Sequence, residues 1–187
     1  MEKVFLKTPS KEDLKYRKKW MSDPKTMSYN AGFDIELKGY DKITGTITKT
    51  DEELNDWYDK WIDHEPDRFF AYIYVENIEE PVGEVYYYSD GNIHSMGIVI
   101  DYKFRGNGYS YGALLELEKI AFEKNKISEL SDMVPLDRIG AVKTFKKAGF
   151  VHTEKEKVEK VFDKDSIVKE LLITKEMYLK KQVLNHY

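Results

Sequence analysis

Residues 96–124, MGIVIDYKFRGNGYSYGALLELEKIAFEK, join an apolar run to a glycine-containing basic turn and then to an amphipathic segment. Ile98, Val99 and Ile100 form the apolar run and predict a buried strand. After the turn, apolar residues recur at three- and four-residue spacing, which predicts a helix with one apolar face. These residues are Ala113, Leu114, Leu117, Ile120 and Ala121. A strand, a glycine turn and a helix in this order can form a receptor for an anion.

The turn between the strand and the helix consists of Arg105, Gly106, Asn107, Gly108, Tyr109 and Ser110. Its glycines allow the backbone to approach an anion closely. The first amides of the following helix have no partner within the helix, so they can donate to the same anion. Arg105 adds a positive charge. We therefore expect these residues to bind a phosphate group.

Two common nucleotide-binding patterns do not fit this turn. A dinucleotide fingerprint needs a third glycine where Tyr111 stands, and no Gly-Lys-Ser or Gly-Lys-Thr run of a P-loop occurs in the chain. The turn instead resembles the acetyl-CoA pyrophosphate loop of the GCN5-related N-acetyltransferases (GNAT), which reads Arg or Gln, two variable residues, Gly, one variable residue, and Gly or Ala. Arg105, Gly108 and Ser110 stand at the three defining positions, and Ser110 departs from the usual Gly or Ala.

A second segment, residues 138–150 (RIGAVKTFKKAGF), is similar to another motif of this family. In that motif Asn, two variable residues and Ala or Ser begin a helix that ends in Lys, a variable residue, Gly and Phe. Arg138 replaces the asparagine, and Phe145 stands where many members have tyrosine. The matching positions are Ala141, Lys147, Gly149 and Phe150. Independently of the resemblance, the segment predicts a helix closed by a glycine.

The rest of the chain predicts a mixed α/β fold of the α+β class. Strands are expected at 4–6, 69–75, 82–88, 129–133, 151–154, 158–162 and 168–174. Further helices are expected after Ser10, after the Thr50 and Glu53 capping box, and over 175–187, while 28–49 should be a long loop or broken strand. The expected result is a GNAT-like fold in a single acetyltransferase domain, 1–187, with a mostly antiparallel twisted sheet flanked by helices.

The composition of the chain argues against several classes of function. The chain has 187 residues and a net charge of -4 with interspersed charges, which argues against wholesale nucleic-acid binding. No run of eighteen apolar residues and no signal-peptide core is present, so we expect a cytoplasmic protein without a membrane segment. The absence of cysteine excludes disulfides and an acetyl-cysteine route, and the histidines show no metal-ligand spacing, so we expect no metal. Exposed aromatics and a C-terminal helix are compatible with a homodimer, which the sequence leaves open.

The resemblance implies acetyl transfer from acetyl-CoA to an amine within a direct ternary complex. In the family, the strand before the loop, here Ile98 to Ile100, pairs with the pantetheine arm, and the loop amides hold the pyrophosphate. A backbone amide of Val99 or Ile100 would stabilise the negative thioester oxygen in the transition state. Arg138 and Lys147 are candidates for contacts with the CoA phosphates.

The proton transfers are less well defined. Phe145 lacks the hydroxyl that a tyrosine would offer to the departing thiolate, so the general acid has no candidate. For the general base, histone-modifying relatives place a glutamate at the position of His94, and imidazole titrates near neutrality. Glu84, in an otherwise apolar or aromatic strand, is the second candidate. The alternative is that His94 faces solvent at a strand start and that Glu84 points outward.

Two acceptors and a non-enzymatic function stay open. The acidic balance favours a small cationic amine, whereas WMSDP at 20–24 resembles a motif of the branch that acetylates ribosomal-protein N-termini. Phe145 and the uncertain base also fit a non-catalytic acyl-CoA-binding or sensing domain. A globular domain unrelated to CoA is the third alternative.

Overall fold

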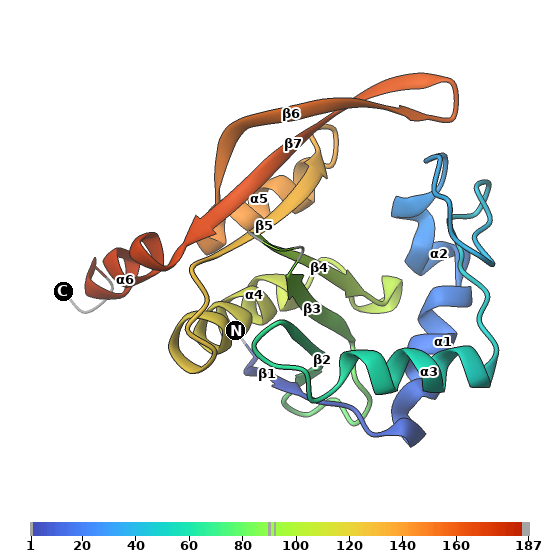
Figure 1. The fold of residues 1–187 in the computed structure, drawn as a ribbon, viewed down its shortest axis with the longest axis horizontal. Coiled ribbons are helices and arrows are strands. Elements are labelled where there is room, and N and C mark those ends of the chain that lie inside the picture. The colour runs from blue at the N-terminus through green and yellow to red at the C-terminus, as the bar shows by residue number, and fades with distance from the viewer. Residues whose placement is uncertain (1, 90, 92, 185–187) are drawn as a thin grey trace.

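The fold is built on one mixed sheet, shown in a computed structural model of the chain (Figure 1). The structure describes residues 2–89, 91 and 93–184. Seven strands follow the order β1-β2-β3-β4-β5-β7-β6, and every neighbouring pair is antiparallel except β4 and β5. The expected mostly antiparallel sheet is thereby confirmed. The strands are β1 Val4–Lys7, β2 Arg68–Val75, β3 Gly83–Ser89, β4 His94–Ile100, β5 Glu129–Pro135, β6 Val151–Val161 and β7 Lys164–Thr174.

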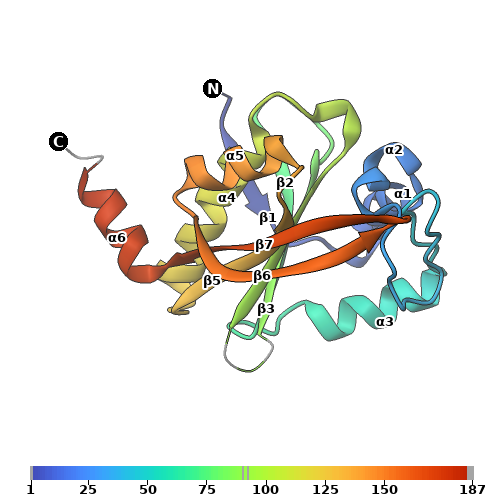
Figure 2. The ribbon, with the colours of Figure 1, turned by 90° about the horizontal axis from the view of Figure 1, so that it is seen from above.

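Helices cover both faces of the sheet (Figure 2). They are α1 Leu14–Ser22, α2 Pro24–Met27, α3 Asp51–Trp61, α4 Tyr109–Lys119, α5 Ile139–Ala148 and α6 Lys175–Leu184. The Thr50 and Glu53 capping box begins α3, as the sequence predicts. At the end of α5, Gly149 adopts a left-handed φ of 107°, a conformation that favours glycine.

Two cores follow from the alternation of side chains along the strands. On one face of β2, Ala71 and Ile73 are fully buried with Leu114 and Leu117 of α4. On the other face, Phe70 and Tyr72 pack in a second cluster with side chains of α1 and α3. That second cluster is mostly aromatic and includes Trp20, Trp57, Trp61 and Tyr86.

The two parallel strands at the middle of the sheet part almost at once. β4 and β5 pair at a single position, Ser95 with Ser131, among the residues that the structure describes. Beyond Ser95, no described strand pairs with the edge of β4 that faces β5, so the backbone N–H and C=O groups of that edge are available for other contacts.

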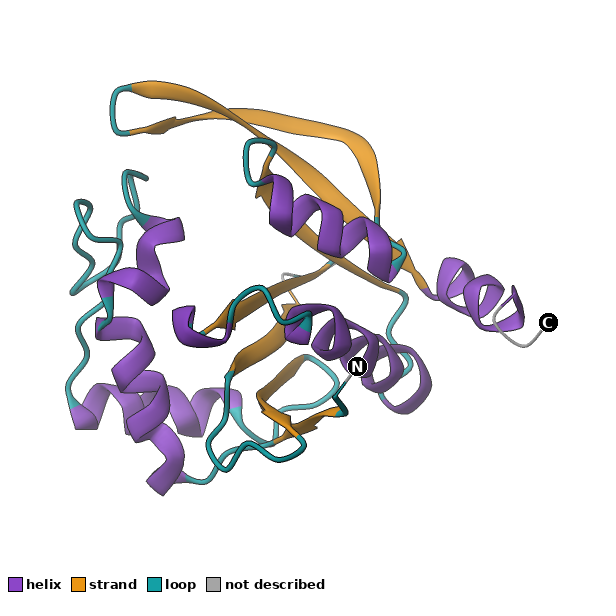
Figure 3. Cartoon of the chain, turned by 180° about the vertical axis from the view of Figure 1, so that it is seen from behind, coloured by secondary structure: helices purple, strands orange, loops and turns teal. Residues whose placement is uncertain are grey.

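One part of the predicted strand pattern was wrong. The segments 151–154 and 158–162 form one long strand, β6, with an irregular register between His152 and Glu156. Together with β7 it forms a long hairpin that extends toward the loops before α3 (Figure 3). The loop over 28–49 is confirmed; it contains a 3₁₀ turn, Ser28–Asn30, and an isolated bridge between Tyr40 and Ile47.

Within the described ranges, no helix is both long enough and apolar enough to cross a membrane.

Candidate active site

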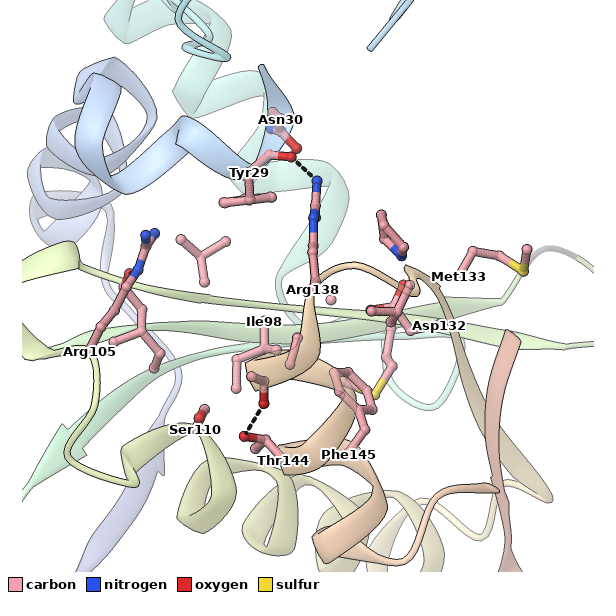
Figure 4. A pocket seen from close by; sticks show the side chains of 18 of the residues that line it. Tyr29, Asn30, Ile98, Arg105, Ser110, Asp132, Met133, Arg138, Thr144 and Phe145 are labelled. Atoms are coloured by element: carbon pink, nitrogen blue, oxygen red, sulfur yellow. Dashed lines mark hydrogen bonds between the residues drawn. The ribbon is translucent and has the colours of Figure 1, made fainter. Parts of the chain in front are cut away.

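A cavity of about 920 Å³ lies where β4 and β5 part. Its wall comes from the loop after α2, from β3, β4, β5, β6 and β7, from the glycine turn and the start of α4, and from α5. Figure 4 shows Arg105 and Ser110 at one end and Asp132 at the other, with Ile98 between them. The cavity therefore connects the predicted anion loop to the gap between the parallel strands.

The glycine turn has the backbone geometry that an anion receptor needs. Gly106 and Gly108 adopt left-handed φ values of 84° and 81°, and Gly108 is the N-cap of α4. The cavity is lined by Arg105, Gly106, Gly108, Tyr109 and Ser110 from this turn, so five of the six residues expected there come together. Tyr109 and Ser110, whose amides precede the first amide that donates within the turn (Tyr111 to the Gly108 carbonyl at 3.1 Å), both lie in this wall.

Arg105 connects the glycine turn to the end of β4 and to α2 by hydrogen bonds. Its Nε donates to the carbonyl of Ile100 at 3.1 Å, and its two Nη atoms donate to the carbonyls of Lys25 and Thr26. The guanidinium thus holds the turn against α2 while its charge stays at the cavity wall. The sixth residue, Asn107, does not line the cavity, and its side-chain amide donates to the carbonyl of Phe104 at 3.1 Å.

The strand before the turn forms the floor of the cavity. Ile98, Val99 and Ile100 all line it, and their pairing with a pantetheine arm stays a prediction. Gly97 also lines it, and a Cβ at this position would lie 2.5 Å from the hydroxyl of Tyr86. The glycine therefore leaves room for the Tyr86 ring to lie across β4 at the cavity.

A half-buried cation lies at the N-cap of α5, on one side of the cavity. Arg138 donates to the carbonyl of Tyr29, and its guanidinium lies 5.5 Å from the Tyr29 ring and 5.3 Å from the Phe33 ring (Figure 4). Desolvation lowers the pKa of Arg138, and the nearby acids, with Asp132 among them, oppose that shift. Arg138 thus joins α5 to the loop after α2. It lines the cavity and donates to a protein carbonyl, and its predicted contact with the CoA phosphates stays a prediction.

Asp132 is a charged site residue that sequence reasoning missed. It lies on β5, directly after the single Ser95 and Ser131 pair, and it lines the cavity. Burial raises the pKa of Asp132 to about 7, against the lowering effect of the Met133 amide and of Arg138. One signal could have found it: aspartate is unfavourable inside a strand, and Asp132 stands within the strand predicted at 129–133.

The two bases that the sequence suggested lie outside the cavity wall. Glu84 forms a buried ion pair with Arg17, whose guanidinium lies 4.1 Å from the Trp57 ring. Burial raises the pKa of Glu84, and Arg17 opposes this shift. His94 is the first residue of β4, and its ring packs edge-on against Tyr87 with 5.6 Å between centroids. Neither side chain is brought to the cavity with the glycine turn.

The helix motif contributes Phe145 but not Lys147 to the wall. Phe145 is buried and packs edge-on against Phe150, with 5.0 Å between ring centroids. It offers the cavity an apolar surface and no proton. Lys147 lies with its Nζ 4.3 Å from the centre of the Tyr111 ring, outside the wall. Thr144, which the sequence did not single out, lines the cavity one residue before Phe145.

Comparisons with known proteins agree with this geometry. A family model described as the acetyltransferase (GNAT) domain matches residues 3–151. A search of curated proteins gave no match. The solved structures include a spermidine N-acetyltransferase from Vibrio cholerae in complex with CoA and spermine, with a TM-score of 0.75 at 19% identity over 95% of this chain and 98% of that one. A GNAT-family acetyltransferase from Bacillus anthracis has a TM-score of 0.69 at 15% identity over 94% and 96%. At these identities the structural matches show the fold.

Proposed function

Because the chain belongs to the GNAT acetyltransferase family and is an acetyltransferase, we propose that it is a cytoplasmic enzyme that transfers the acetyl group of acetyl-CoA to a primary amine. The amine attacks the thioester directly in a ternary complex, and no metal takes part. The main support for the proposal is that one cavity is lined both by the glycine turn at the start of α4 and by β4 and β5 at the gap between them.

Acetyl-CoA would occupy this cavity with its pyrophosphate at the turn and its thioester in the gap. The amides at the start of α4 would donate to the phosphate oxygens. The free edge of β4 would pair with the amide groups of the pantetheine arm. An amide of Val99 or Ile100 would then stabilise the thioester oxygen as it becomes negative, and a donor of this kind contributes about 10² to 10³ in rate.

For the acceptor, we favour a small amine over the N-terminus of a folded protein. The tip of the β6 and β7 hairpin meets the loop after α2 through a bridge between Phe33 and Val161. The Phe162 amide also donates to the carbonyl of Gly32 at 2.7 Å. This contact closes one side of the cavity and leaves less room for a bulky partner. The solved neighbour from Vibrio cholerae binds spermine, a small polyamine, which supports the same preference.

The glycine turn can be tested by placing a carboxylate in it. Ser110→Asp keeps a residue that suits a helix start but brings a negative charge to the predicted pyrophosphate site. We expect CoA affinity, measured by isothermal titration calorimetry, to fall by about tenfold or more because like charges repel across a few ångströms. Acetylation of an amine panel that includes spermidine and peptide N-termini should fall in parallel.

Ser10→Asp is the matched control. Ser10 also stands at a helix start, but it is exposed and does not line the cavity. This variant should bind CoA as the parent does. If Ser110→Asp binds CoA with unchanged affinity, the glycine turn is not the pyrophosphate site.

A further inference from the structure

The gap between β4 and β5 holds a carboxylate that the family resemblance did not predict. We propose that Asp132 is the general base that removes the proton from the acceptor ammonium before it attacks the thioester. This inference rests on the proposed amine acetylation and deepens it, because it assigns the group that makes the acceptor nucleophilic.

The position of Asp132 follows from the sheet. In the described part of the chain, Ser131 makes the one parallel pair with β4, so Asp132 is the first residue of β5 beyond the point where the strands part. It lines the main cavity at the end opposite Arg105 and Ser110 (Figure 4). It also lines a second cavity of about 170 Å³, bounded in part by Ser95 and Ser131. The Asp132 side chain therefore lies between the proposed thioester site and a second, smaller cavity that is lined partly by polar side chains.

The carboxylates of the main cavity differ in their partners. Asp34 pairs with Lys42 at 2.5 Å, and Glu159 pairs with Lys157. Among the residues that the structure describes, no cation forms an ion pair with Asp132. The cation at the N-cap of α5, Arg138, donates to the Tyr29 carbonyl. Asp132 is thus the lining acid that is free to accept a proton from a bound substrate.

The surroundings of Asp132 suit a base that works near neutral pH. Desolvation raises its pKa to about 7, which lets it hold a proton and also lose it under physiological conditions. The titratable groups that share its two cavities are Tyr29 and Asp34 from the loop after α2, Tyr86 and Tyr88 from β3, Arg105 and Tyr109 from the glycine turn and the start of α4, Arg138 at the N-cap of α5, Lys155, Glu159 and Lys160 from β6, and Glu170 from β7. Lys155 pairs with Glu170 at 3.2 Å and Lys160 pairs with Asp165, so these two cations are engaged elsewhere.

The proposed step balances without another reactant. The Asp132 carboxylate takes one proton from the acceptor ammonium, which leaves a neutral amine with a free electron pair. The nitrogen forms a bond to the thioester carbonyl carbon, and the carbon–sulfur bond then breaks with its electron pair on sulfur. The second proton of the nitrogen goes to the thiolate, giving the amide and free CoA. Asp132 returns its proton to solvent.

The test is the pH dependence of acetylation in Asp132→Asn. The parent enzyme should show kcat rising with pH through a midpoint near the pKa of Asp132, because only the deprotonated carboxylate accepts a proton. Asparagine cannot do so, and we expect kcat to fall by about 10² to 10⁴ and this acidic limb to disappear. CoA affinity by calorimetry should stay within a few fold of the parent value, which shows that the variant is folded.

Asp34→Asn is the matched control, since it removes another carboxylate of the same cavity. We expect it to keep the acidic limb, whatever its effect on acceptor KM. His94→Gln and Glu84→Gln extend the comparison to the two bases that the sequence suggested. Loss of the limb in either of these variants, with the limb retained in Asp132→Asn, would assign the base to that residue and overturn the proposal.

A direct titration separates this inference from the proposed function. The carboxyl carbon resonance of Asp132, assigned by its absence in Asp132→Asn, should titrate with a midpoint well above that of an ordinary aspartate. A midpoint in the ordinary range contradicts the assignment even if the protein acetylates amines. If the parent protein turns over no amine while this midpoint is raised, the acceptor class is wrong, and the base assignment falls with it.

Discussion

At the scale of single residues, Asp132 lowers the free energy of unfolding of the protein at neutral and alkaline pH. Its folded pKa of about 7 lies above the value of about 3.9 in an unfolded chain. Between these two values the folded state binds a proton that the unfolded state has lost, so stability falls as pH rises through this window and is level above it. A charged group held in a poorly solvated cavity destabilises the protein in this way, and active sites often carry such groups.

We therefore predict that Asp132→Asn is more stable than the parent at alkaline pH. The melting temperature should rise by several degrees at about pH 8, where the parent must bury a charge, and change little at about pH 4, where it does not. Thermal melts by circular dichroism across this range provide the measurement, with Asp34→Asn as the exposed comparison. An equal shift at both pH values would show that the substitution acts through packing and not through the charge.

At the scale of elements, local pattern explains what the sequence could predict. The strand, turn and helix of 96–124 form from residues that are neighbours in the chain, so periodicity and glycine placement were sufficient. The strand β6 was harder because none of its residues is buried and its side chains alternate little between apolar and polar, whereas β7 carries the buried Val168, Leu171 and Ile173. Asp132 was missed for a different reason: its role depends on the parting of β4 and β5, which pairs residues 36 positions apart in the chain (Ser95 and Ser131).

The tip of the β6 and β7 hairpin should control access of the acceptor. The Phe162 ring packs on Gly32, where a Cβ would come within 2.6 Å of it. We predict that Phe162→Ala loosens the contact between the hairpin and the loop after α2, so that the KM of a small amine rises severalfold while the Kd of CoA stays unchanged. Steady-state kinetics with varied amine and calorimetry with CoA separate the two effects.

Val158→Ala tests whether the effect belongs to the hairpin tip. Val158 lies on the same hairpin and is 64% exposed, so its truncation should alter neither constant. Equal changes in the two variants, or a loss of CoA affinity in Phe162→Ala, would mean that the tip does not act on the acceptor alone.

At the scale of the whole molecule, the C-terminal helix α6 contacts both α4 and α5, the two helices that contribute to the cavity wall. Lys181 of α6 forms an ion pair with Glu118 of α4 and donates to the carbonyl of Ala148 at the end of α5 at 2.6 Å. Tyr178 of the same helix donates to Glu123 at 2.5 Å. Glu118 is fully buried, so one cation from the end of the chain balances a charge in the centre of the fold. The sequence placed a helix here but gave no sign of its partner.

Removing that cation should make stability depend on pH. Burial raises the pKa of Glu118 to about 7, and Lys181 opposes the rise. In Lys181→Met the opposing charge is lost, so the pKa rises further and the folded state must bury an unpaired carboxylate at alkaline pH. We predict a loss of about 3 to 5 kcal/mol in the free energy of unfolding at about pH 8 and a smaller loss at about pH 6, measured by urea denaturation. Adding Glu118→Gln should recover much of the loss at the higher pH, because the buried charge is then absent. If the double variant is as unstable as Lys181→Met, the lysine stabilises the fold through the Ala148 carbonyl and its packing, and not through Glu118.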